Sequence, residues 1–177
     1  MNFLKLNRPY FGLILLVATF VSCNNDDDII APITLGSSVT VTNTFQSTAF
    51  TNDLELPVES LFQIPAGILA ATSNITEGVE FPEYLLNLYD INIDKNSITF
   101  EVVAESNDPT YGNLFRVLEP NTFDRYYFTF DKAQNVKGFS SSNSSVNLRI
   151  DAPNVLVVEI GEGYDFNPDQ EFTITLK

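Results

Sequence analysis

Carboxylates dominate the side chains of this sequence that could do acid-base or nucleophilic chemistry. The 177 residues include no histidine, a single cysteine and 23 acidic residues. Without histidine, the Ser-His and Cys-His pairs of hydrolases and the commonest metal ligand are excluded. The run from Gly138 to Ser142 lacks the second glycine of a nucleophile elbow and reads as a turn. A pair of carboxylates is what remains for catalysis.

Glu101 and Glu105 form one such pair, and glycoside hydrolysis uses two carboxylates. Both residues alternate with apolar side chains along a predicted strand, where carboxylates ordinarily meet water. We therefore predict that the protein is not an enzyme. A small carboxylate-dependent hydrolase is the minor alternative.

Two series of oxygen-bearing side chains have the alternate spacing of calcium loops. The first series is Asp90, Asn92, Asp94, Asn96 and Glu101, and the second is Asp165, Asn167, Asp169 and Glu171. In the first, Lys95 stands where an EF-hand needs glycine, and a hairpin explains the residues without a metal. Residues 167–170 of the second read as a type I turn. We therefore predict no cofactor, with calcium at these loops as the less favoured alternative.

Tyrosines are the other candidate binding residues, because a tyrosine ring can meet a sugar or a protein while its hydroxyl stays hydrated. Tyr111 and Tyr164 lie in predicted loops, and Tyr127 alternates away from Tyr126 and Phe128. Tyr111, Tyr127 and Tyr164 are therefore the candidates for an exposed binding surface. The alternative is that these tyrosines cap the open ends of the fold.

The formal net charge of the whole chain is −14. Such an acidic surface repels nucleic acid and anionic head groups, so we predict no nucleic-acid partner. The single cysteine is Cys23, which leaves no second thiol for a disulfide or a zinc site.

The first 28 residues have the layout of a secretory signal. Lys5 and Arg8 precede an apolar run over residues 10–21, and small Ser22 precedes Cys23. The apolar run is shorter than a membrane-spanning helix requires.

This stretch resembles the signal of a bacterial lipoprotein, in the looser form seen in Bacteroidota because Phe20 replaces the usual leucine. The resemblance implies that residues 1–22 are removed and that Cys23 carries the lipid. The acidic run Asn24, Asn25, Asp26, Asp27 and Asp28 looks like the export signal of surface lipoproteins in that phylum. The implied location is the outer membrane, lipid-anchored and facing the cell exterior. The resemblance covers only this segment and names no family for the rest.

The remaining chain divides into a polar, acidic tether over residues 23–37 and one domain over residues 38–177. Period-2 alternation and turn residues predict strands at 38–43, 85–93, 97–105, 113–118, 125–131, 136–139, 146–150, 155–160 and 171–176. Residues 54–72 fit either a short helix over 57–62 or two buried strands. The pattern predicts an all-β fold, an antiparallel sandwich of immunoglobulin-like or jelly-roll-like type. A small barrel of lipocalin type is the alternative.

These observations predict a noncatalytic outer-membrane lipoprotein that binds a ligand or partner, with a glycan or an envelope protein as candidates. The structural alternative is an accessory of an envelope complex that offers an edge strand, such as residues 136–139, to its partner.

Overall fold

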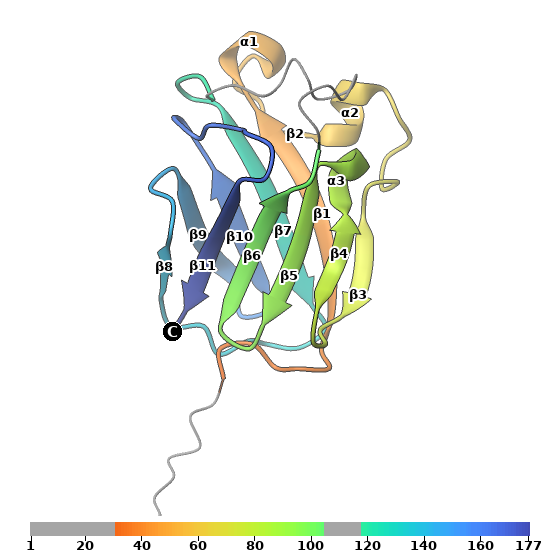
Figure 1. Ribbon diagram of the computed structural model, residues 1–177. Helices are drawn as coiled ribbons and strands as arrows, with labels where there is room; N and C mark the ends of the chain where they lie inside the picture. The colour runs from red at the N-terminus through yellow and green to blue at the C-terminus, as the bar shows by residue number, and fades with distance from the viewer. Residues whose placement is uncertain (1–30, 105–117) are drawn as a thin grey trace, which may run out of the picture.

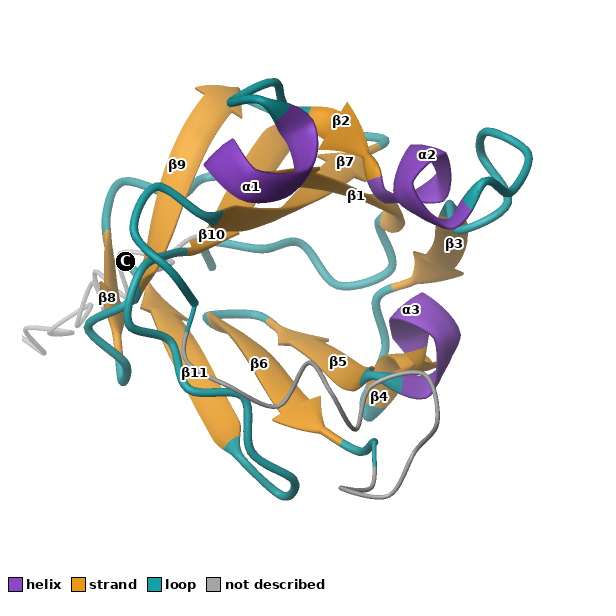
Figure 2. Ribbon diagram, turned by 90° about the horizontal axis from the view of Figure 1, so that it is seen from above, coloured by secondary structure: helices purple, strands orange, loops and turns teal. Residues whose placement is uncertain are grey.

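Two antiparallel β-sheets packed face to face make up the protein in a computed structural model, which describes residues 31–104 and 118–177 (Figures 1 and 2). The sheets do not close on each other. The predicted sandwich is therefore confirmed, and the barrel alternative is wrong.

One sheet has six strands in the order β2-β1-β7-β10-β9, with β3 also paired to β1. Its strands are β1 (Ser38–Gln46), β2 (Leu56–Pro57), β3 (Ala71–Asn74), β7 (Phe123–Phe130), β9 (Val146–Ala152) and β10 (Val155–Ile160). The other sheet has five strands in the order β4-β5-β6-β11-β8. Its strands are β4 (Val79–Glu83), β5 (Tyr89–Asp94), β6 (Ser97–Val102), β8 (Phe139–Ser141) and β11 (Glu171–Leu176).

Alternating side chains of these strands meet between the sheets and form an aromatic core. Tyr126, Phe128 and Phe130 of β7 are buried, as their period-2 spacing predicts. Phe100 of β6 stacks on Phe172 of β11 with ring centroids 4.8 Å apart, and it meets Tyr126 edge-on at 5.0 Å. Offset and edge-on contacts are the arrangements that aromatic quadrupoles favour, so these rings join the two sheets.

Several strands begin at other residues in the structure than the sequence predicts. The strand predicted from residue 85 begins only at Tyr89, because Leu85 and Leu86 have left-handed backbone angles. The edge strand predicted over 136–139 forms instead as β8, whose pairing with β11 starts at Phe139. Of the strand predicted over 113–118, all but Leu118 lies outside the described residues.

The domain starts earlier than predicted, since the last residues of the predicted tether pack onto it. Ile33 is fully buried, and its backbone N–H donates to the carbonyl of Lys95. The Gly36 N–H likewise donates to the carbonyl of Ile75. Ile33 and Leu35 are too short a series to establish a period, and Leu35 is exposed, so sequence reasoning could not assign Ile33 to the core.

Three short helical segments lie together at one end of the sandwich: α1 (Thr48–Thr51), α2 (Val58–Phe62) and α3 (Tyr84–Asn87) (Figure 1). The helix predicted over 57–62 is confirmed as α2, with Pro57 just before its first residue. The described chain begins at the opposite end, beside the turn between β5 and β6 (Figure 1). We call these ends the helical pole and the N-terminal pole.

Candidate functional site

The three tyrosines that are candidates for a binding surface do not form one. Tyr164 is fully buried, and its ring packs edge-on against Phe166 and Phe172 at centroid distances of 4.7 and 5.6 Å. The prediction of an exposed Tyr164 is wrong because a turn, in which the Tyr164 N–H donates to the Gly161 carbonyl, folds this loop into the core. Tyr111 lies outside the described residues.

Tyr127 does face away from the core, as predicted, on the outer face of the six-stranded sheet. Its hydroxyl donates to the carboxylate of Glu55. The same carboxylate accepts from Arg125, whose guanidinium also donates to Glu159 at 2.7 Å. This ionic network links β7 to Glu55 and to Glu159 of β10. The Tyr127 hydroxyl is therefore already hydrogen-bonded within the protein.

The first calcium series lies on an extended hairpin. In register across the sheet, Glu101 of β6 stands opposite Asp90 on one side and Glu171 on the other. This acidic row lies on the outer face, since the neighbouring residues Tyr89 and Val102 point into the core. Over residues 31–104 and 118–177, no three acidic or sulfur-bearing residues are grouped so as to hold a metal ion.

The second calcium series surrounds a turn. The N–H of Gln170 donates to the carbonyl of Asn167 at 3.2 Å, closing a four-residue turn over 167–170. The predicted turn type is wrong, because Asp169 at its third position has a φ of 60°, which is typical of type II and not of type I. Asp165, before the turn, and Asp169, within it, are both exposed.

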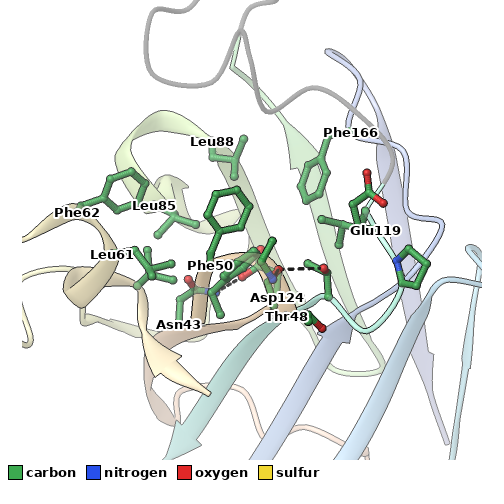
Figure 3. Close-up of a pocket in the computed structure, with 17 residues that line it drawn as sticks. Asn43, Thr48, Phe50, Leu61, Phe62, Leu85, Leu88, Glu119, Asp124 and Phe166 are labelled. Carbon is green, nitrogen blue, oxygen red and sulfur yellow. Dashed lines mark hydrogen bonds between the residues drawn. The ribbon is translucent and has the colours of Figure 1, made fainter. Parts of the chain in front are cut away.

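An apolar pocket with a volume of about 870 Å³ lies at the helical pole (Figure 3). Its walls come from β1 and β7 of the six-stranded sheet, from all three helical segments and from the loops at this pole. The apolar lining comprises Phe45, Ala49, Phe50, Val58, Leu61, Phe62, Leu85, Leu88, Leu118, Pro120 and Phe166. The polar lining comprises Asn43, Ser47, Thr48, Glu119, Thr122 and Asp124. This volume and mixture are typical of sites for drug-sized ligands.

Asp124 and Asn43 form a polar group within the pocket (Figure 3). Asn43 donates through Nδ2 to Asp124 Oδ1 at 2.6 Å, and the Tyr126 hydroxyl donates to Asp124 Oδ2 at 2.7 Å. Asp124 is only 6% exposed. Each carboxylate oxygen therefore accepts one hydrogen bond from a neutral donor.

Strand periodicity explains why these polar residues meet. On β7, Asp124 continues the inward series of Tyr126, Phe128 and Phe130. On β1, Asn43 continues the inward series of Val39 and Val41. The two strands are antiparallel and place Asn43 opposite Tyr126, so both apolar series become polar at the helical pole.

Burial raises the pKa of Asp124 to about 6, although the hydrogen bonds from Asn43 and Tyr126 oppose this effect. The carboxyl is therefore mostly ionised at neutral pH. Burial, followed by the charge of Asp124, raises the pKa of Tyr126 well above its usual value. Tyr126 thus keeps its proton and can only donate to Asp124.

Side-chain hydrogen bonds hold two of the pocket walls. The Ser47 hydroxyl accepts from the Ala49 N–H at the start of α1, and the Ser47 N–H donates to Thr51 Oγ1. Within α2, buried Glu59 accepts from the N–H groups of Gly67 and Leu69 through one carboxylate oxygen. These contacts hold α1, which carries Phe50, and α2, which carries Leu61.

Sequence reasoning missed this site, although one signal was present. The strand predicted over 125–131 needed only one more step of its alternation to place Asp124 on the inward face. An acidic residue at the end of an aromatic stripe is unusual, because an unpaired buried carboxylate is costly.

Among the described residues, no helix is long and apolar enough to cross a membrane. Comparison of the chain with protein-family models, with curated proteins and with solved structures finds no significant match.

Proposed function

We propose that this chain is a noncatalytic, lipid-anchored binding module of the bacterial outer membrane that holds a small apolar ligand in the pocket at its helical pole. The pocket carries the proposal. It combines a volume of about 870 Å³ with aromatic and aliphatic walls from many segments of the chain. A protein that only needed stability would gain by filling such a space, since buried voids forfeit packing energy.

Exposed apolar side chains at the same pole support this proposal. Phe50 lines the pocket and is 74% exposed, and Phe62 and Leu86 nearby are also exposed. Large apolar groups exposed together ordinarily mark a binding site. Exposed Phe50 and Glu119 also connect the pocket lining with solvent.

The location of the pocket is compatible with a lipid anchor at Cys23. The described chain starts at the N-terminal pole, whereas the pocket lies at the helical pole (Figure 1). A tether leaving the N-terminal pole would keep the pocket on the side away from the membrane, open to ligands arriving from outside.

An apolar ligand suits this pocket better than a glycan does. Sugar sites present many hydrogen-bonding groups beside their aromatic rings, whereas Leu61, Leu85 and Leu88 are aliphatic. The buried carboxyl, Asp124, is held by Asn43 and Tyr126. It has no partner placed as a second catalytic carboxylate in the described lining, where Glu119 is exposed, so we assign no hydrolysis to it.

The experiment is a fluorescence titration of the protein with Nile red, a neutral apolar dye. We expect saturable binding that Ala49→Trp abolishes, because Ala49 is an exposed residue on the pocket wall and an indole there would fill the cavity. Ile150→Trp is the matched control, since Ile150 is exposed and outside the pocket lining.

An unfolding curve of each variant verifies that the fold is kept. Absence of saturable binding, or equal binding by Ala49→Trp and wild type, would refute the pocket function.

A further inference from the structure

The pocket contains charge of one sign only. Asp124 and Glu119 are the ionisable residues of its described lining, which includes no lysine or arginine. Arg125, although next to Asp124 in sequence, alternates to the other face and is engaged with Glu55 and Glu159. The negative charge of Asp124 therefore has no cationic partner on its own side of the sheet within the described chain.

The groups around Asp124 do not neutralise its charge. Its hydrogen-bond donors, Asn43 and Tyr126, are neutral. The hydroxyls of Tyr84, Tyr89 and Tyr164, from the other side of the sandwich, are also uncharged, because burial raises the pKa of each.

Asn43 contributes a further acceptor that has no partner. Its Nδ2 donates to Asp124 and to the carbonyl of Arg125, whereas its Oδ1 is buried and accepts nothing from the residues described. Asn43 is 3% exposed and lines the pocket. An unpaired buried acceptor costs free energy that a donating ligand would recover.

Building on the pocket function proposed above, we propose that the ligand is a cationic amphiphile, with its apolar body in this pocket and a protonated amine against Asp124 and Asn43. An ammonium group donates up to three hydrogen bonds and supplies the missing positive charge. Anionic amphiphiles such as fatty acids would meet Asp124 and Glu119 with like charge. Neutral amphiphiles would leave the charge of Asp124 unpaired.

Displacement of Nile red by three ten-carbon competitors tests the charge preference. Decylamine, decanol and decanoate share one apolar chain and differ in head group, and each is used below its critical micelle concentration. For the wild type we expect decylamine to displace the dye at a concentration at least about tenfold lower than decanoate, with decanol between them, as one charged hydrogen bond would give.

Asp124→Asn should abolish most of this preference while Nile red still binds. Glu162→Gln is the matched control, because Glu162 is exposed and outside the pocket lining, and it should keep the preference despite losing one negative charge. Thr48→Lys provides a second variant that does not alter the buried group. Thr48 is an exposed lining residue, and a cation there should weaken decylamine relative to decanoate.

The outcomes separate the two proposals. If Nile red binds but the three competitors displace it equally, or if the preference persists in Asp124→Asn, the cationic ligand class is refuted and the pocket function stands. If Nile red does not bind, both proposals fail.

Discussion

At the scale of single residues, Asp124 sets the chemistry of the pocket and reduces the stability of the fold. Its carboxyl is buried against neutral donors, and burial raises its pKa to about 6 from the usual 3.8. The folded state therefore binds this proton more tightly than the unfolded state does. The stabilising contribution of the protonated Asp124 carboxyl is fully present below about pH 4 and is lost as pH rises through about 6.

Replacing Asp124 by asparagine should make this contribution visible. The amide can still accept from Asn43 and meet Tyr126, but it does not ionise. We compare the free energies of unfolding of Asp124→Asn and wild type. The difference in favour of Asp124→Asn should grow by about 2 kcal/mol as the pH rises from 4 to 7, since one pKa unit corresponds to about 1.4 kcal/mol. Urea unfolding of both proteins at several pH values measures this difference. A difference that does not change with pH would contradict the assignment of an ionised, buried Asp124.

At the scale of elements, α3 is the strained part of the pocket wall. Glu83, Leu85 and Leu86 all have positive φ values, between 53° and 58°. For a residue with a Cβ, this conformation costs about 1 to 2 kcal/mol. In this backbone conformation Leu85 lines the pocket and Leu86 is exposed. Backbone strain of this kind is most often found at functional sites.

Comparison of glycine with alanine at residue 86 should reveal this strain. We expect Leu86→Gly to be more stable than Leu86→Ala by about 1 kcal/mol, because glycine adopts positive φ without the steric cost. Val79 on β4 is the matched control, being similarly exposed without a positive φ, and there alanine should be the more stable. Thermal unfolding of the four variants decides the matter. If the alanine variant were the more stable at residue 86 as well as at residue 79, α3 would be unstrained.

The acidic row on the outer face of the five-stranded sheet predicts a second effect. Glu101 faces Asp90 and Glu171 across the sheet, and like charges in this arrangement repel. We expect Glu101→Lys to raise the free energy of unfolding by about 1 kcal/mol at low ionic strength, and by less in high salt. Glu101→Gln should give roughly half of the gain, since it removes repulsion without adding attraction.

Adding calcium tests the alternative that this acidic row binds a metal ion. If added calcium stabilised the wild type and not Glu101→Lys, the row would be a metal site, and the repulsion argument would be wrong.

Most strands of this fold could be predicted from alternation alone, whereas the site could not. The spacing of Phe172, Ile174 and Leu176 predicts β11 with its bounds and its inward face. Positive φ at Leu85 and the burial of Tyr164 have no such local signal, because both depend on contacts between distant segments. The pocket likewise needs β1 and β7 side by side, a pairing that no sequence pattern specifies.

At the scale of the whole molecule, the two poles have different roles in our proposal. The N-terminal pole receives the chain from the predicted tether, and Ile33 anchors it there by complete burial. The helical pole presents the pocket and its exposed apolar rim. This arrangement only serves ligand capture from the medium if the predicted lipid on Cys23 is present and the protein faces outward.

Protease accessibility on intact cells, followed by membrane fractionation, tests that condition. We expect the wild type to be membrane-bound and digested from outside, and Cys23→Ala to leave the membrane fraction, because one acylated residue supplies the anchor. Replacement of Asp26, Asp27 and Asp28 by alanine should leave the protein membrane-bound but protected, since only the export signal is lost. A protected wild type would mean that the acidic run is a linker and that the pocket faces the periplasm, where only ligands that cross the outer membrane could reach Asp124.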